Sequence, residues 1–123
     1  MRSRRHQRLG ELLKRELGQI LIREFGDAPD LGMITVHEVV LSGDLRIATA
    51  YVGIYGNPEV QERTWKELNR YRRHLQDILA HTLVLRRAPH LRFVLDHSVE
   101  KGTRVLQILE EIEKQNSPDQ SES

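Results

Sequence analysis

The sequence predicts an α+β domain in which helices cover one face of a three-stranded sheet. Three observations indicate this fold: leucines at helical spacing near the N-terminus, two neighbouring β-rich stretches, and a long helical pattern followed by a third alternating stretch. The expected order is helix, strand, strand, broken helix, strand and short helix, without an internal repeat. A chain of 123 residues is long enough for one modest core and too short for two.

The first helix is expected from about Arg4 to Phe25. Gly26 ends its pattern, and Pro29 follows shortly after. Apolar side chains recur at helical spacing along one face, namely Leu9, Leu12, Leu13, Leu17, Ile20 and Leu21. The opposite face carries Arg4, Arg8, Arg15 and Gln19.

Three stretches have the composition of strands. The first two, Met33–Leu41 and Leu45–Ile54, are rich in β-branched residues and are joined by Ser42-Gly43-Asp44, which suits a hairpin turn. The third, Leu91–Asp96, alternates so that Leu91, Phe93 and Leu95 share one face.

A second, longer helical pattern begins at Asn57-Pro58-Glu59, which supplies an N-cap, a first-turn proline and an early acid, and runs to about Leu85. Arg72 falls in the middle of its apolar side, where an unpaired arginine is costly. Either the Arg72 head group reaches outward, or the helix is interrupted between Asn69 and Arg73. We favour the interruption, because about 27 uninterrupted helical residues is long for a domain of this size.

The C-terminal part is expected to differ in character from the rest. Val99–Glu113 forms a short amphipathic helical segment, whereas residues 115–123 are polar and expected to be disordered. We therefore assign a single domain to residues 1–114 and a tail to residues 115–123.

Positive charge is concentrated in one region. Residues 63–92 contain eight Lys or Arg against two acids, although the chain has a net charge of only +1. Such segregation is typical of a nucleic-acid-binding face, and charge alone leaves an ordinary solvated helix surface as an alternative. The candidate phosphate contacts are Arg63, Lys66, Arg70, Arg73, Arg86, Arg87 and Arg92.

Several classes of function are disfavoured. The chain has no cysteine, which excludes disulfides and thiolate metal sites. Its six histidines show no metal-ligand spacing, and no glycine-rich phosphate loop occurs. No apolar run approaches the roughly 18–20 residues that span a bilayer, and the N-terminus does not have the pattern of a secretory signal. Asp96-His97-Ser98 has the residue types of a triad, but neighbours on an extended chain point in opposite directions. We expect an intracellular protein that is not an enzyme and has no cofactor or metal.

Five of the six aromatic residues, by their places on the predicted strands and helices, are expected to pack in the core or at its edges rather than to stack on bases. These five are Tyr51, Tyr55, Trp65, Tyr71 and Phe93. Recognition would then rely on the nucleic-acid backbone and on shape.

The predicted element order resembles a type II KH domain, an RNA-binding module, although no two glycines flank the helix break. Four stretches between Leu31 and Val105 resemble the ribosome-binding factor A family, whose members assist assembly of the bacterial small ribosomal subunit, and the resemblance as a whole covers roughly residues 4–112. They are Leu31-Gly32-Met33-Ile34-Thr35-Val36, Asp44-Leu45-Arg46-Ile47-Ala48-Thr49-Ala50-Tyr51-Val52, Leu83-Val84-Leu85-Arg86-Arg87-Ala88-Pro89-His90-Leu91-Arg92-Phe93 and Asp96-His97-Ser98-Val99-Glu100-Lys101-Gly102-Thr103-Arg104-Val105.

The resemblance implies a cytoplasmic, monomeric, non-enzymatic factor that binds the immature small (30S) subunit through 16S rRNA and assists late maturation and 5′-end processing. RNA contact is expected from Arg70, Arg72, Arg73, Arg86 and Arg87, with Arg63 and Lys66 beside them and Arg4, Arg8 and Arg15 as a second patch. The family usually places Ala-x-Gly at the helix break, whereas this chain has Tyr71-Arg72-Arg73.

Other interpretations remain open from the residues alone. The basic face could bind an acidic protein partner instead of RNA. A small hydrolase built on Asp96, His97 and Ser98 lacks a suitably spaced base, and a membrane-surface helix at residues 4–25 is weakened by Glu11, Glu16 and Glu24.

Overall fold

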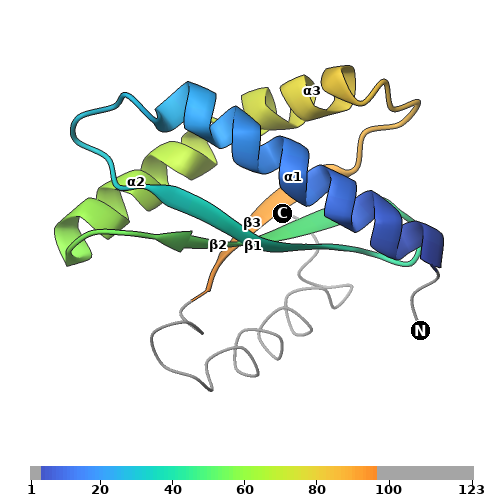
Figure 1. Ribbon diagram of the computed structural model, residues 1–123, viewed down its shortest axis with the longest axis horizontal. Coiled ribbons are helices and arrows are strands. Elements are labelled where there is room, and N and C mark those ends of the chain that lie inside the picture. Colours follow the sequence, from blue (N-terminus) through green and yellow to red (C-terminus); the bar gives the residue numbers. More distant parts are fainter. Residues whose placement is uncertain (1–3, 97–123) are drawn as a thin grey trace.

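The computed structural model describes residues 4–96, which form three helices on one face of a three-stranded sheet (Figure 1). The elements are α1 (Arg4–Phe25), β1 (Ile34–Leu41), β2 (Ile47–Ile54), α2 (Pro58–Arg70), α3 (Arg72–Thr82) and β3 (His90–Leu95). The predicted α+β class is confirmed, and so is the predicted order as far as the third strand. The expected segment Val99–Glu113 and the expected tail lie outside the described residues.

The sheet has the strand order β1-β2-β3. β1 and β2 form an antiparallel hairpin that runs from the pair Ile34↔Ile54 to the pair Leu41↔Ala48. β3 lies parallel to β2, because the two helices α2 and α3 carry the chain back across the sheet before β3 begins. The register between β1 and β2 shifts at His37, which forms a β-bulge.

The core lies between the sheet and the helices. Alternate residues of β2 point toward the helices and are buried, whereas Thr49 and Tyr51 point to the other face. The apolar faces of all three helices meet these strands, as the spacing predicts. The largest fully buried side chains are Leu13, Leu17, Ile20, Leu21, Val52, Thr64, Leu68, Leu75 and Leu91.

Helix α1 lies close against the sheet at Gly10. A Cβ atom at this position would lie 2.8 Å from the carbonyl oxygen of Val39 in β1. The glycine therefore lets the backbone of α1 rest against β1, which fixes the height of the helix above the edge of the sheet.

The hairpin turn is closed by polar side chains. The Ser42 hydroxyl donates to the Asp44 carboxylate at 2.7 Å and accepts from the Ile47 N–H at 2.9 Å. The hydrogen bond from Ser42, followed by that from the backbone N–H of Arg46, holds the pKa of Asp44 below its ordinary value. Leu45 has a φ of 62°, so the turn is longer than the predicted link Ser42-Gly43-Asp44.

Helix α2 begins as the sequence predicts. Asn57 is the N-cap, and its side-chain oxygen accepts the N–H of Val60 at 2.9 Å. Thr64, fully buried one turn after Val60, accepts the N–H of Gly32 at 2.8 Å. The Thr64 bond ties the first turns of α2 to the loop that enters β1.

Candidate nucleic-acid interface

The predicted interruption of the long helix is confirmed, and it occupies a single residue. Tyr71 separates α2 from α3 with φ −94° and ψ 8°. Its N–H still donates to the Glu67 carbonyl at 3.1 Å, and its carbonyl accepts the Leu75 N–H at 2.9 Å. Because this backbone region is accessible to any L-residue, the chain breaks the helix here without a glycine.

Of the two interpretations that the sequence left open for Arg72, the structure confirms the interruption. The helix is interrupted just before Arg72, and its guanidinium bonds polar groups inside the fold instead of reaching outward to solvent. One nitrogen donates to the Leu91 carbonyl in β3 and to the Gln76 side-chain oxygen, both at 2.9 Å. The same Gln76 oxygen accepts the Leu91 N–H at 2.8 Å. Arg72 therefore joins α3 to β3, which gives this predicted RNA contact a structural role.

The basic residues of α2 lie on its exposed face, and each has a neighbour within the fold. Lys66 lies 3.5 Å from Glu62, and Arg70 lies 3.3 Å from Glu67. Arg63 donates to the backbone carbonyl of Asp30 at 2.8 Å. Exposed ion pairs of this kind are worth little energetically, so phosphate groups can compete for these cations.

Arg73 on α3 and Arg86 and Arg87 in the loop before β3 are exposed. Within residues 4–96 these three guanidiniums have no hydrogen bond or ion pair. They do not converge on one point, because α3, of 11 residues, separates Arg73 from the loop by about 16 Å at 1.5 Å per residue. The predicted residues thus form a stripe along α2, the break, α3 and the following loop. We call this stripe, comprising Arg63, Lys66, Arg70, Arg73, Arg86 and Arg87, the basic stripe.

The loop that carries Arg86 and Arg87 has a strained residue, Val84, at its second position. Helix α3 ends at Thr82, three residues before the predicted end, and Val84 follows with a φ of 51°. The Leu85 N–H donates to Ala80 and the Val84 N–H to His81, at 3.0 and 3.2 Å, the pattern of a Schellman motif. A β-branched residue is an unusual occupant of its left-handed position.

We expect Val84→Gly to raise the free energy of unfolding by about 0.5–1 kcal/mol, because glycine adopts this conformation without the Cβ penalty. The Val84 side chain is 87% exposed, so its removal sacrifices little packing. Urea unfolding followed by circular dichroism measures the difference. An unchanged or lowered unfolding free energy would show that Val84 is not strained.

Tyr71 is an exposed aromatic that sequence reasoning assigned to the core. The prediction was wrong for Tyr71, which is 42% exposed, and for Tyr55, which is 80% exposed, whereas Tyr51 and Phe93 are buried as expected. The Tyr71 ring packs edge-on against Phe25 at 5.8 Å, and the Arg70 guanidinium lies 5.7 Å from its centroid. The sequence feature that could have indicated its exposure is its position between two arginines, Arg70 and Arg72, at a helix break.

Asp96, considered above as a triad member, pairs with a histidine of another strand. Its carboxylate lies 3.0 Å from Nδ1 of His37, whose Nε2 lies 3.2 Å from the Thr35 hydroxyl. The His37 ring crosses β2 at Gly53, where a Cβ atom would meet it at 2.8 Å. The pair links β1 to the end of β3 on the face of the sheet opposite the helices. His97 and Ser98 lie outside the described residues.

Among residues 4–96, no group of three or more potential ligand side chains is arranged to hold a metal ion. No helix in that range is long and apolar enough to cross a membrane. The exposed arginines of the expected second patch, Arg4, Arg8 and Arg15, lie on α1.

Comparisons with known proteins agree with this architecture. The sequence model of the family described as ribosome-binding factor A matches residues 5–109. A ribosome-binding factor A from a Nostoc species is 40% identical over 118 residues, covering 95% of this chain and 89% of the relative. One from Halothermothrix orenii is 32% identical over 122 residues, covering 99% of both chains.

Two sets of coordinates for a relative have the same fold. The crystal structure of ribosome-binding factor A from Thermus thermophilus has a TM-score of 0.62 and 32% identity, covering 73% of this chain and 94% of that one. A homology model of the Thermus thermophilus protein, fitted into a cryo-EM map of a 30S–RbfA complex, also has a TM-score of 0.62, with 30% identity and coverage of 75% and 96%. The fold is KH-like. Because the family model matches residues 5–109 and the relatives align with nearly the whole chain, this chain belongs to the ribosome-binding factor A family.

Proposed function

We propose that this protein binds the small ribosomal subunit and contacts 16S rRNA through the basic stripe. The observation that carries the proposal is the exposure of Arg73, Arg86 and Arg87 without a partner in residues 4–96, on a chain of the ribosome-binding factor A family. A relative with the same fold has been fitted into a map of a 30S complex, which makes the small subunit the natural partner to test.

The geometry supports contact with the RNA backbone. A row of guanidinium and ammonium groups along two helices and a loop matches the repeated charge of a phosphate chain, and each neutralised phosphate releases a counterion. Arginine can also bond phosphate through two parallel N–H groups. Tyr71, half-exposed among these arginines, adds one surface on which an unstacked base could lie. Affinity should therefore fall steeply as salt is raised.

The proposal includes a role in late maturation of the subunit and in 5′-end processing of its rRNA. A protein that binds backbone and shape without a catalytic centre acts by favouring one RNA conformation over another. The protein would hold the immature RNA in a state that the processing enzymes can use, as a monomer in the cytoplasm and without a cofactor.

Fractionation of cell extracts tests the proposal directly. The protein is expected to sediment with free small subunits and not with whole ribosomes, and depletion of the protein is expected to leave 16S rRNA with unprocessed 5′ ends. Nuclease treatment of the small-subunit fraction should release the protein from the subunits. Release by nuclease supports the RNA interpretation; a complex that survives complete digestion would favour the alternative, an acidic protein partner for the basic face.

A further inference from the structure

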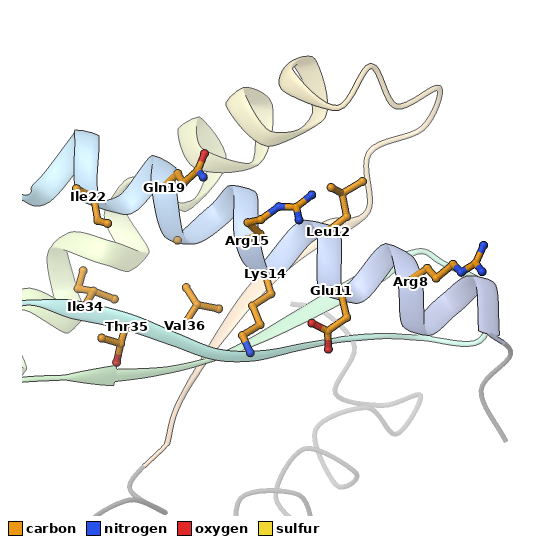
Figure 2. A pocket seen from close by; sticks show the side chains of 11 residues that line it. Arg8, Glu11, Leu12, Lys14, Arg15, Gln19, Ile22, Ile34, Thr35 and Val36 are labelled. Carbon is orange, nitrogen blue, oxygen red and sulfur yellow. The ribbon is translucent and has the colours of Figure 1, made fainter.

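A wide hollow on the helix side of the sheet lies away from the basic stripe, between α1 and the edge strand β1. It encloses about 800 Å³. Figure 2 shows Ile22 reaching down from α1 toward β1, and Ile34 and Val36 reaching up from the strand. Ile22 is 69% exposed although it belongs to the last two turns of a packed helix. The floor of this groove is therefore apolar, with Ile22 exposed, Val36 half-buried and Ile34 buried.

One wall of the groove is the unpaired edge of a strand. Within residues 4–96, β1 pairs with β2 alone. The Met33 carbonyl accepts the Tyr55 N–H at 2.9 Å, so alternate residues of β1 bond to β2, and the backbone groups of Ile34 and Val36 point away from the sheet. The hydrogen bonding of Val52, the partner of Val36 in β2, is consistent with this register. The Val52 carbonyl points toward β3, where it accepts the Asp96 N–H at 2.7 Å, and so does not bond to Val36.

The open edge is short. The β-bulge at His37 follows Val36 immediately and interrupts the regular spacing of backbone groups. An incoming strand could therefore form a regular ladder only over the first residues of β1. This limits the occupant to a short extended segment rather than to a long strand or a whole sheet.

The rim of the groove is positive. Arg8, Lys14 and Arg15 line it against a single acid, Glu11, and Figure 2 shows the Lys14 side chain extending from α1 down to the strand. Two copies of this chain paired edge to edge would bring their basic rims together, which disfavours a symmetric dimer. A phosphate backbone would match the rim but would leave the isoleucine floor and the strand edge unused.

We propose that this groove binds a short, extended, acidic peptide segment of a partner protein, which adds to β1 as a fourth strand. Main-chain hydrogen bonds to Ile34 and Val36 would hold the segment, and apolar side chains at alternate positions would cover Ile22 and the floor. An acidic side chain on the same face would meet Lys14. The site lies at the edge of the sheet opposite β3, so this proposal and the RNA proposal can fail independently.

A synthetic heptapeptide, Asp-Glu-Thr-Val-Thr-Ile-Thr with blocked ends, carries the required pattern, since its glutamate, valine and isoleucine share one face. Titrated into the ¹⁵N-labelled full chain, it is expected to shift the amide signals of Ile34 and Val36 with half-saturation below about 1 mM. Two N-methylated versions of the peptide distinguish binding through backbone hydrogen bonds to β1 from binding through side chains alone. Methyl groups on one alternate set of amides should weaken binding at least about tenfold, and on the other set should have little effect, because only one set faces β1.

Lys14→Glu and Ile22→Asp are each expected to weaken peptide binding at least about fivefold, whereas Arg23→Glu, an exposed change on the same helix outside the groove, should not. Unchanged signals of core residues confirm that the variants are folded. The proposal is overturned if the peptide shifts nothing at about 1 mM, or if both N-methylated peptides bind equally. It is also overturned if dilution of the protein alone shifts Ile34 and Val36, which would indicate self-pairing, or if an rRNA oligonucleotide and not the peptide shifts them.

Discussion

Replacing Arg73, Arg86 and Arg87 together by glutamate is expected to weaken binding to purified small subunits by at least about a hundredfold at moderate salt. These three side chains are exposed and have no partner among residues 4–96, so their replacement removes three candidate phosphate ligands and introduces repulsion. The slope of log affinity against log salt should also become shallower by about 2–3, since each neutralised phosphate contributes about 0.7–0.9 to that slope. Co-sedimentation or filter binding at several salt concentrations measures both quantities.

A variant with the same charge change elsewhere serves as the control. Arg5, Arg23 and Arg46 are exposed and lie outside the basic stripe, and their joint replacement by glutamate changes the net charge equally. This control is expected to lose no more than about tenfold in affinity, through the long-range field alone. Equal losses in the two triple variants would show that net charge, and not the basic stripe, determines binding.

Arg72→Met is expected to lower the free energy of unfolding by about 2–3 kcal/mol, because a hydrogen bond to a charged group disappears and a partly buried carbonyl is left without its donor. In the native protein the Arg72 guanidinium bonds both the Leu91 carbonyl and Gln76. Methionine keeps most of the apolar stem, so the change isolates the polar interactions. Urea unfolding followed by circular dichroism provides the measurement.

Arg73→Met is the matched comparison for this experiment. Arg73 is the next residue in the chain, but it is exposed and makes no hydrogen bond of this kind in the described range, so its replacement should change the unfolding free energy by less than about 0.5 kcal/mol. The affinity for small subunits should show the opposite order: Arg73→Met should lose more affinity than Arg72→Met, measured under conditions in which both variants are folded. If Arg72→Met retains full stability and binds poorly instead, Arg72 belongs to the interface after all.

Most of the secondary structure could be predicted because the local signals agree with the fold. The bounds of α1 and the cap at Asn57 match the prediction, since they depend on helical periodicity and capping chemistry. The break at Tyr71 was also predictable, because an arginine in the apolar register cannot be buried without a partner. The partner itself, the Leu91 carbonyl in β3, was not predictable, since it lies 19 residues away and is brought near by tertiary packing.

The candidate site was predictable in composition and less so in arrangement. Charge counting found every member of the basic stripe, but it could not distinguish Arg73, which has no polar partner in the described range, from Arg72, which supports the fold. Tyr55 and Tyr71 were misassigned because hydrophobicity indicates a tendency to be buried and does not say which side of an element faces solvent. The groove beside β1 was invisible to sequence reasoning, because it depends on the height at which α1 crosses the strand.

Tethered hydroxyl-radical probing would test the central claim, that the basic stripe faces rRNA, most directly. The chain has no cysteine, so a single introduced cysteine carries the iron chelate at one known position. Asp77→Cys and Ala88→Cys place the probe on exposed positions beside Arg73 and Arg87, and Tyr55→Cys places it on an exposed residue outside the stripe. We expect 16S rRNA cleavage in small-subunit complexes from the first two positions and little from the third. Strong cleavage from Tyr55→Cys with none from Asp77→Cys or Ala88→Cys would contradict the claim.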